Sequence, residues 1–202
     1  MLARYERLVS AGELQADPDQ RRAAQRLDRL QKDLEADSSG GLLAQLFKPK
    51  KARPEGVYMW GGVGRGKSML MDLFVETLGI AEKRRAHFHE FMLEVDRRMR
   101  ERRTSDPGDP TGKVARDIAA DVRCLAFDEM VVNNTADAAI MARLFTALIR
   151  DEGVTVVTTS NRPPRDLYKD GLNRSLFLPF IDLVEDEMDV LPLNGPTDYR
   201  LD

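Results

Sequence analysis

Apolar and polar positions follow two different periodicities along this chain. Short apolar runs predict strands at residues 57–60, 86–89, 122–127, 154–159 and 188–193. Longer segments with apolar residues every three or four positions predict helices at 68–78, 90–103 and 135–150, with a loop at 104–112. Strands that alternate with helices favour an α/β fold, with a mostly parallel sheet of about five strands and helices on both faces.

An amphipathic helix precedes this part of the chain. Asp17 can act as its N-cap, with Pro18 in the first turn. Apolar residues then follow at spacings of four, three and four on one face: Ala23, Leu27, Leu30 and Leu34. Most helices of this kind bury their apolar stripe, so we expect it to dock on its own domain rather than on a partner protein.

Residues 38–55 interrupt the helical pattern. The segment opens with Ser38-Ser39-Gly40-Gly41 and ends in a basic stretch from Lys48 to Arg53. This composition is typical of a linker. Its apolar residues are expected to dock on the domain or on another protein: Leu42, Leu43, Leu46 and Phe47. The pattern therefore predicts three parts: an amino-terminal helical segment (1–37), a linker with a basic end (38–55) and a core (56–202).

The composition is that of a soluble globular protein, with 42% hydrophobic and 32% charged residues. Lys and Arg total 31 against 34 Asp and Glu, and this balance argues against a surface built wholly to bind nucleic acid or anionic lipid. Cys124 is the only cysteine, so an internal disulfide is excluded. No apolar run approaches the roughly 20 residues of a membrane-spanning helix, and residues 1–10 show no secretory signal. We expect a cytoplasmic protein.

The strongest chemical signal is Gly61-Gly62-Val63-Gly64-Arg65-Gly66-Lys67-Ser68, between a predicted strand and a predicted helix. This is the phosphate-loop pattern G-x-x-x-x-G-K-[ST] in its required context, which predicts a P-loop NTPase. Its glycines let backbone N–H groups converge on phosphate oxygens, and the helix N-terminus adds positive partial charge. Lys67 is expected to contact the β- and γ-phosphates, and the Ser68 hydroxyl to bind Mg²⁺.

Two carboxylates, Asp128 and Glu129, follow the apolar strand at 122–127. They should lie at the carboxyl edge of the sheet, where α/β proteins bind their ligands. Asp128 fits an acceptor for magnesium-bound water, and Glu129 fits the base that polarises an attacking water. Their adjacency favours hydrolysis over transfer to an organic acceptor.

Asn161 follows the strand at 154–159, whose tip should lie beside Asp128 and Glu129. Its amide could orient the lytic water, but the segment around it is equally typical of an ordinary turn. Arg174 precedes the apolar run 176–181 and could reach the γ-phosphate of a neighbouring subunit. Arg162 is the competing candidate, and a solvated surface arginine is an equal alternative for both.

Two further clusters are interpreted as structural. His87 and His89 should share one face of the strand at 86–89, and with few other ligands nearby we favour packing over zinc binding. Arginines interrupted by Glu101 fill residues 97–103. They spread over several helix faces without interleaved aromatic residues, which favours a solvated surface over a nucleic-acid-binding one.

Long segments of the chain resemble the ZapE family, also called the "ATPase family gene one" group. They are residues 57–74 around the phosphate loop, 87–92, Phe127-Asp128-Glu129, 159–164, 166–174, 176–181 and 198–201. The resemblance covers nearly the whole chain. It implies an AAA+-type ATPase that uses ATP and Mg²⁺, assembles into homo-oligomers and acts on a protein partner.

In this family, bacterial relatives act at the division site with the tubulin-like ring protein, and mitochondrial relatives act in protein quality control. The resemblance also implies that Asn161 is a polar sensor and Arg174 the trans-acting arginine. The metal would lie at Ser68 and Asp128, and catalysis would involve Glu129, Asn161 and Arg174. The residues expected to bind ATP are Gly61, Gly62, Val63, Gly64, Arg65, Gly66, Lys67, Ser68 and Met69.

Members of the family normally continue into a carboxy-terminal lid region, whereas this sequence stops at Asp202. The favoured function is an ATP hydrolase that acts on a protein partner of the division-ring type. One alternative is an ATP-binding interaction module with little hydrolysis, because the lid is missing. Another is a nucleic-acid-loading ATPase, given the basic stretch of the linker. A small-molecule kinase and a GTPase are less favoured, since neither an acceptor pocket nor an Asn-Lys-x-Asp segment is found.

Overall fold

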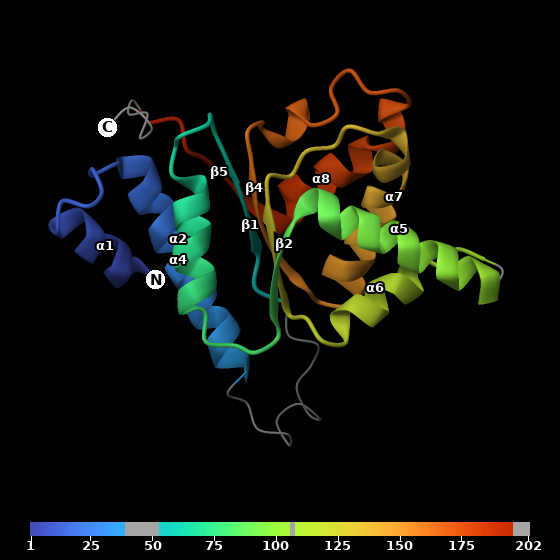
Figure 1. Cartoon of the computed structure of the whole chain (residues 1–202), viewed down its shortest axis with the longest axis horizontal. Coiled ribbons are helices and arrows are strands. Elements are labelled where there is room, and N and C mark those ends of the chain that lie inside the picture. The colour runs from blue at the N-terminus through green and yellow to red at the C-terminus, as the bar shows by residue number, and fades with distance from the viewer. Residues whose placement is uncertain (39–52, 106–107, 196–202) are drawn as a thin grey trace.

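The computed structural model describes residues 1–38, 53–105 and 108–195, and these form a five-stranded sheet between two groups of helices (Figure 1). All neighbouring strands are parallel, in the order β2-β3-β4-β1-β5. The strands are β1 (Gly56–Trp60), β2 (Lys83–His87), β3 (Cys124–Asp128), β4 (Thr155–Ser160) and β5 (Met188–Pro192). The α/β fold expected from the alternation of strands and helices is confirmed.

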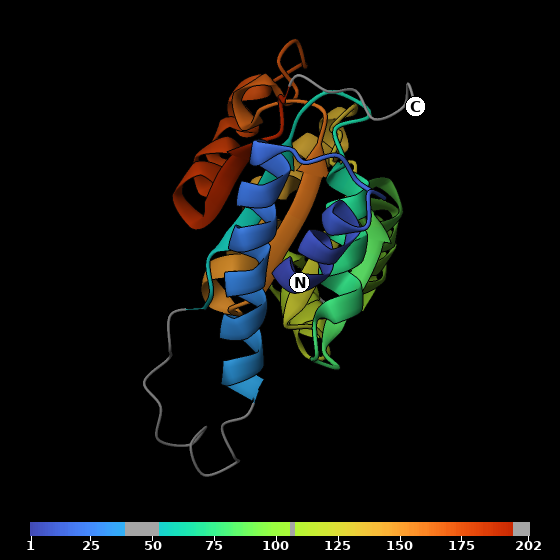
Figure 2. The ribbon, with the colours of Figure 1, turned by 90° about the vertical axis from the view of Figure 1, so that its left-hand side faces the viewer.

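The helices cover both faces of this sheet. One face carries α1 (Leu2–Ser10), α2 (Pro18–Ser38) and α4 (Lys67–Thr77), which Figure 2 shows in front of the strands. The other carries α5 (Phe88–Ser105), α6 (Thr111–Ala119), α7 (Thr135–Thr146) and α8 (Leu178–Glu187). Short helical turns complete the described chain at Ala147–Asp151, Pro164–Asp166 and Arg174–Leu176.

Successive residues of β1 point to opposite faces, so this strand contributes to two apolar cores. Val57 and Met59 pack with α2 and α4, whereas Tyr58 between them packs with the aromatic residues of the other face. All three side chains are fully buried. Burial on both faces explains why the strand reads as a continuous apolar run.

The amphipathic helix docks on its own domain, as expected. Asp17 Oδ1 accepts hydrogen bonds from the backbone N–H groups of Asp19 (2.8 Å) and Gln20 (3.0 Å), which is N-cap geometry. The predicted apolar stripe is buried against β1 and α4. Its members are Ala23, Leu27, Leu30 and Leu34.

Strand β2 and helix α5 differ from the sequence prediction in their boundaries. Strand β2 begins at Lys83 rather than Ala86 and ends at His87, because its three basic residues pair in register with β3 at the edge of the sheet. An edge strand with charged side chains lacks the apolar signature that predicted the others. Helix α5 also continues to Ser105, into the expected loop.

Most of the predicted linker, including its four apolar residues and the basic residues from Lys48 to Lys51, lies outside the described residues. The segment Asp198-Tyr199-Arg200-Leu201 lies outside them as well. Within the described ranges, no helix is both long enough and apolar enough to cross a membrane.

Candidate functional site

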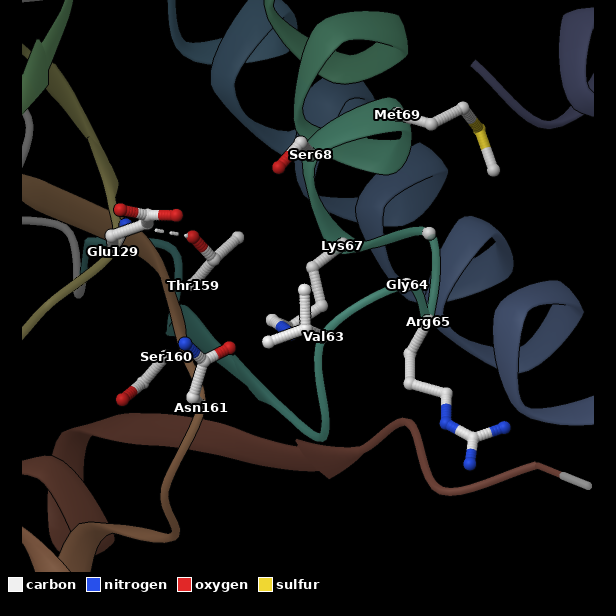
Figure 3. Close-up of a pocket in the computed structure, with 11 residues that line it drawn as sticks. Val63, Gly64, Arg65, Lys67, Ser68, Met69, Glu129, Thr159, Ser160 and Asn161 are labelled. Carbon is white, nitrogen blue, oxygen red and sulfur yellow. Dashed lines mark hydrogen bonds between the residues drawn. The ribbon is translucent and has the colours of Figure 1, made fainter. Parts of the chain in front are cut away.

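The carboxyl ends of β1, β3 and β4 meet at one edge of the sheet, because the strands are parallel and β4 lies between the other two. The chain leaves β1 in the phosphate loop and enters α4 at Lys67. A pocket of about 230 Å³ lies between this loop and the tips of β3 and β4 (Figure 3). It is lined by residues 63–69, Glu129 and residues 159–161. The topology thus brings together Lys67, Glu129 and Asn161.

The phosphate loop curls through two glycines, Gly64 and Gly66, whose φ angles are both 77°. Only glycine adopts this left-handed conformation without strain. A side chain at Gly66 would also meet the amide of Gln20, 2.6 Å from the added carbon. Helix α2 therefore packs directly against the loop, and the Gln20 amide donates to the Arg65 carbonyl at 3.3 Å.

Lys67 is a buried cation that is held by its own loop. Its Nζ donates to the carbonyl oxygens of Gly61 and Gly62, both at 2.7 Å. Burial lowers the pKa of the Lys67 ammonium, and the negative charge of Glu129 opposes that shift. Two neutral acceptors satisfy the ammonium less strongly than a phosphate would, so an anion in the pocket can replace them.

Glu129 turns away from the line of β3 because its backbone is left-handed, with φ 54°. Its N–H donates to the Thr159 hydroxyl at 3.0 Å, and the next N–H, of Met130, donates to the Thr159 carbonyl at 2.7 Å. The Ser160 hydroxyl donates back to the Met130 carbonyl at 3.0 Å. These bonds fix the tip of β3 on the tip of β4, and Figure 3 shows Glu129 and Asn161 on the wall opposite Lys67 and Ser68.

Asp128, the last residue of β3, is paired with Arg85 of β2 through both carboxylate oxygens. It borders a second pocket of about 500 Å³, which shares Ser68 and Glu129 with the first. Among the described residues, no group of three or more His, Cys, Asp or Glu side chains is placed to hold a metal by itself. The oxygen donors of Ser68 and Asp128 nevertheless fit Mg²⁺, which usually takes few protein ligands and completes its shell with phosphates and water.

Asn161 lies at the carboxyl end of β4, in a turn that β1 supports. The buried Tyr58 hydroxyl donates to the Arg162 carbonyl at 2.8 Å, and burial raises the pKa of that hydroxyl. The Arg162 N–H donates to the Ser160 hydroxyl at 3.3 Å. The turn is therefore anchored from both sides, while the exposed Asn161 faces the pocket.

Arg174 is not among the residues that line the phosphate pocket. It begins a helical turn, and its Nη2 donates to the Arg165 carbonyl at 2.7 Å. Two large apolar side chains beside it are exposed, Leu172 at 71% and Leu176 at 53%. Within one chain, the structure therefore separates Arg174 from the other predicted site residues.

The expected arrangement of the two histidines is wrong. His87 is the last residue of β2, opposite Asp128 in the parallel register, and it borders the second pocket. His89 lies in the first turn of α5. They do not share a strand face, because the chain changes from strand to helix at Phe88.

The basic run of α5 carries acidic partners. Arg98 pairs with Glu94 at 2.7 Å and Arg102 with Asp117, and Arg100 pairs with Asp96. These acids offset the positive charge of the run, so the geometry favours the solvated surface that its spacing predicts.

Several residues of the site were missed by sequence reasoning. Thr159 and Ser160 look like the end of an ordinary strand, although their hydroxyl groups hold the tip of β3. Arg85 lies in a basic stretch of the chain. The one signal that could have indicated its role is that charged residues within a strand need partners of opposite charge. Gln20 belongs to a helix about 45 positions upstream of the loop, and no local pattern connects the two.

Comparison with known proteins identifies relatives of the whole chain. The family model described as AFG1-like ATPase matches residues 1–202. The chain is similar to the cell division protein ZapE of Escherichia coli K12, at 38% identity over 98% of this chain and 56% of that protein. It spans about half the length of the curated relatives it matches.

Two solved structures share the fold at low sequence identity. The structure of DnaI has a TM-score of 0.62 at 14% identity, and the match covers 93% of this chain and 87% of that one. DnaA of Aquifex aeolicus, solved with bound AMPPCP, has a TM-score of 0.58 at 14% identity and covers 93% of this chain and 50% of that one. At this identity the likeness shows the fold alone, a P-loop NTPase core.

Proposed function

Since the chain belongs to the AFG1-like ATPase family, we propose that it binds ATP with Mg²⁺ in the pocket of the phosphate loop and hydrolyses it. The observation that carries the proposal is the placement of Lys67 and Ser68 on one wall of the pocket and Glu129 and Asn161 on the other. A cation and a helix N-terminus, which can bind phosphate, thus face a carboxylate and an amide, which can bind water.

Binding begins at the phosphate loop. Backbone N–H groups of residues 63–68 and the N-terminus of α4 receive the phosphate oxygens. Lys67 exchanges the carbonyl oxygens of Gly61 and Gly62 for oxygens of the β- and γ-phosphates. Ser68 and Asp128 are the residues that would hold Mg²⁺, which supplies charge neutralisation at the phosphates when it is bound.

Hydrolysis depends on the opposite wall. Glu129 accepts a proton from a water as that water's oxygen bonds to the γ-phosphorus and the bond to the bridging β–γ oxygen breaks, which leaves ADP and phosphate. Asn161 orients the same water by hydrogen bonding. Because Thr159 fixes the backbone of Glu129, the base is positioned before the substrate binds.

We further propose that the protein is cytoplasmic and acts as a homo-oligomer on a protein partner of the division-ring type. Three observations support this proposal: the similarity to a protein named for cell division, the separation of Arg174 from its own pocket, and the exposed leucines beside it. In an oligomer, Arg174 would serve the pocket of a neighbouring subunit. The division into residues 1–37, 38–55 and 56–202 remains part of this proposal.

The test compares Glu129→Gln with the unaltered chain. We expect phosphate release to fall by about 100-fold or more, because a general base is lost. Binding of a fluorescent ATP analogue should stay within about twofold, since the phosphate loop is intact. Equal turnover in both proteins would refute the assignment of Glu129, and no turnover by the unaltered chain at any concentration would support a non-hydrolysing module.

The role of Arg174 has its own test. Turnover per chain should rise with protein concentration if a neighbouring subunit completes the site. Arg174→Ala should remove most of that rise and leave nucleotide binding intact, whereas Arg162→Ala tests the competing candidate. A larger loss in Arg162→Ala would assign the trans-acting role to Arg162.

A further inference from the structure

Arg85 of β2 reaches the end of the neighbouring strand β3. Its Nε donates to Asp128 Oδ2 at 2.6 Å and its Nη2 to Asp128 Oδ1 at 3.1 Å. Its Nη1 donates to Asp72 Oδ1 of α4 at 2.5 Å. The guanidinium therefore binds both oxygens of one carboxylate and is tethered to a second one.

The burial of these three side chains shows which contact matters more. Asp128 is 11% exposed, whereas Arg85 is 30% and Asp72 52% exposed. A carboxylate as buried as Asp128 needs a counter-charge, and a bidentate guanidinium supplies it with fixed geometry. The more exposed contact with Asp72 contributes less and mainly holds the guanidinium in place. The negative charge of Asp128 is thus already compensated by the chain itself.

The guanidinium also lies where a free cation would approach. Arg85, Asp72 and Asp128 line the second pocket, which shares the lining residues Ser68 and Glu129 with the phosphate pocket. A divalent cation that enters from the second pocket meets a positive charge in contact with both oxygens of Asp128. The guanidinium is within hydrogen-bond distance of both Asp128 oxygens, and Asp128 is largely buried. It therefore repels the cation strongly, because solvent screens the two positive charges only in part.

We propose that Arg85 is a positioning residue that keeps Asp128 from binding a free divalent cation, so that the site takes magnesium only together with the nucleotide phosphates. The inference rests on the nucleotide site proposed above. The phosphates would supply additional ligands for the ion, and Asp128, oriented by Arg85, would hold it from the protein side.

The test measures Mn²⁺ binding to the full, nucleotide-free chain by electron paramagnetic resonance. In Arg85→Met, Asp128 loses its counter-ion, so we expect a new Mn²⁺ site with at least about tenfold higher affinity than in the unaltered chain. Arg84→Met is the matched control. Arg84 lies on the same strand but pairs with Glu94 and lies 5.8 Å from the centre of the Phe91 ring, so Mn²⁺ binding should not change.

The double variant Arg85→Met/Asp128→Asn should lose the new site. If the gain persists there, or if Arg85→Met binds Mn²⁺ no more tightly than the unaltered chain, the proposal is wrong. ATP binding and hydrolysis by the unaltered chain would then still stand, because they are measured separately. Should circular dichroism show that Arg85→Met does not fold, Arg85→Lys replaces it. A single ammonium cannot bridge all three carboxylate oxygens, so we expect Mn²⁺ affinity to rise by about threefold. No rise in Mn²⁺ affinity would refute the role of Arg85.

Discussion

The two walls of the phosphate pocket are built in different ways. The first, residues 63–69, is one continuous segment that presents backbone N–H groups and one lysine. The second is assembled from the tips of β3 and β4, about 30 residues apart in sequence, and presents the side chains of Glu129 and Asn161. We call them the phosphate wall and the water wall.

This difference separates binding from turnover. Under the proposed function, the phosphate wall would contact groups that carry negative charge before and during the reaction, so it would contribute to ground-state binding. The water wall would act on a molecule that becomes reactive only in the transition state, so it would contribute mainly to turnover. Variants of the two walls should therefore have different kinetic signatures.

The largest effect is expected from Lys67→Ala in the phosphate wall. Loss of charge-assisted bonds to phosphate should weaken ATP binding by about 100-fold or more, and turnover should fall with it. The measurement is titration with a fluorescent ATP analogue. Lys83→Ala is the matched control, because Lys83 Nζ also donates to two carbonyl oxygens, those of Val75 and Leu78, both at 2.6 Å, but near the opposite end of α4.

Lys83→Ala should lower the stability of α4 by roughly 1 kcal/mol and leave ATP affinity unchanged. If both variants lost ATP binding equally, the effect of Lys67 would be structural, and the phosphate wall would have no special role for its lysine.

A smaller effect is expected from Asn161→Ala in the water wall. A misoriented water should lower turnover by about tenfold to 100-fold, while the affinity for ATP stays within about twofold. Steady-state phosphate release at saturating ATP measures the first quantity, and equilibrium titration the second. A variant that lost affinity rather than turnover would place Asn161 in the phosphate wall and break the comparison.

The phosphate wall could be predicted almost completely from the sequence, whereas the water wall could be predicted only in part. A phosphate loop is a local pattern, so its residues can be recognised from their immediate neighbours in the sequence. Glu129 and Asn161 were predicted because each follows an apolar strand, and parallel strands end at the same edge of a sheet. The hydroxyl groups that fix them depend on the order of strands, which no local pattern encodes.

Arg85 could not be assigned for a related reason. Its partners, Asp72 and Asp128, belong to a helix and a strand far apart in sequence, and the register between β2 and β3 brings Arg85 close to Asp128. The prediction of strands from apolar runs also misplaced β2, because an edge strand tolerates charged residues. Tertiary pairing thus decided both the boundary of the strand and the partners of its arginine.

Thr159→Val tests how the water wall is positioned, with an expected loss of turnover of about fivefold. The variant keeps the shape of the side chain but removes the hydroxyl that accepts from the Glu129 N–H, a bond of about 1 kcal/mol. Thr158→Val is the control on the same strand, since its hydroxyl donates to the Phe127 carbonyl at 3.3 Å and does not contact Glu129. Equal turnover in the two variants would remove Thr159 from the positioning of the base.

The smallest expected effect tests whether the phosphate wall depends on helix α2. Gln20 is 1% exposed, and its amide donates to the Arg65 carbonyl at 3.3 Å, beside the left-handed Gly66. Gln20→Ala removes one long hydrogen bond, so ATP affinity should fall by about two- to threefold while turnover at saturating ATP does not change. Titration and phosphate release measure the two quantities.

Gln31→Ala is the matched control for this variant, because Gln31 is a glutamine of the same helix whose amide donates to the Thr77 carbonyl at 2.8 Å, at the far end of α4. Gln31→Ala should lose more stability, because the Gln31 side chain also bonds to Met1, Glu35 and the Thr77 hydroxyl, but only Gln20→Ala should weaken ATP binding. A fall in turnover without a fall in affinity would contradict the division between the walls, because the Gln20 amide bonds to the phosphate wall. An effect on affinity alone would instead extend the phosphate wall to a residue that the local loop pattern does not contain.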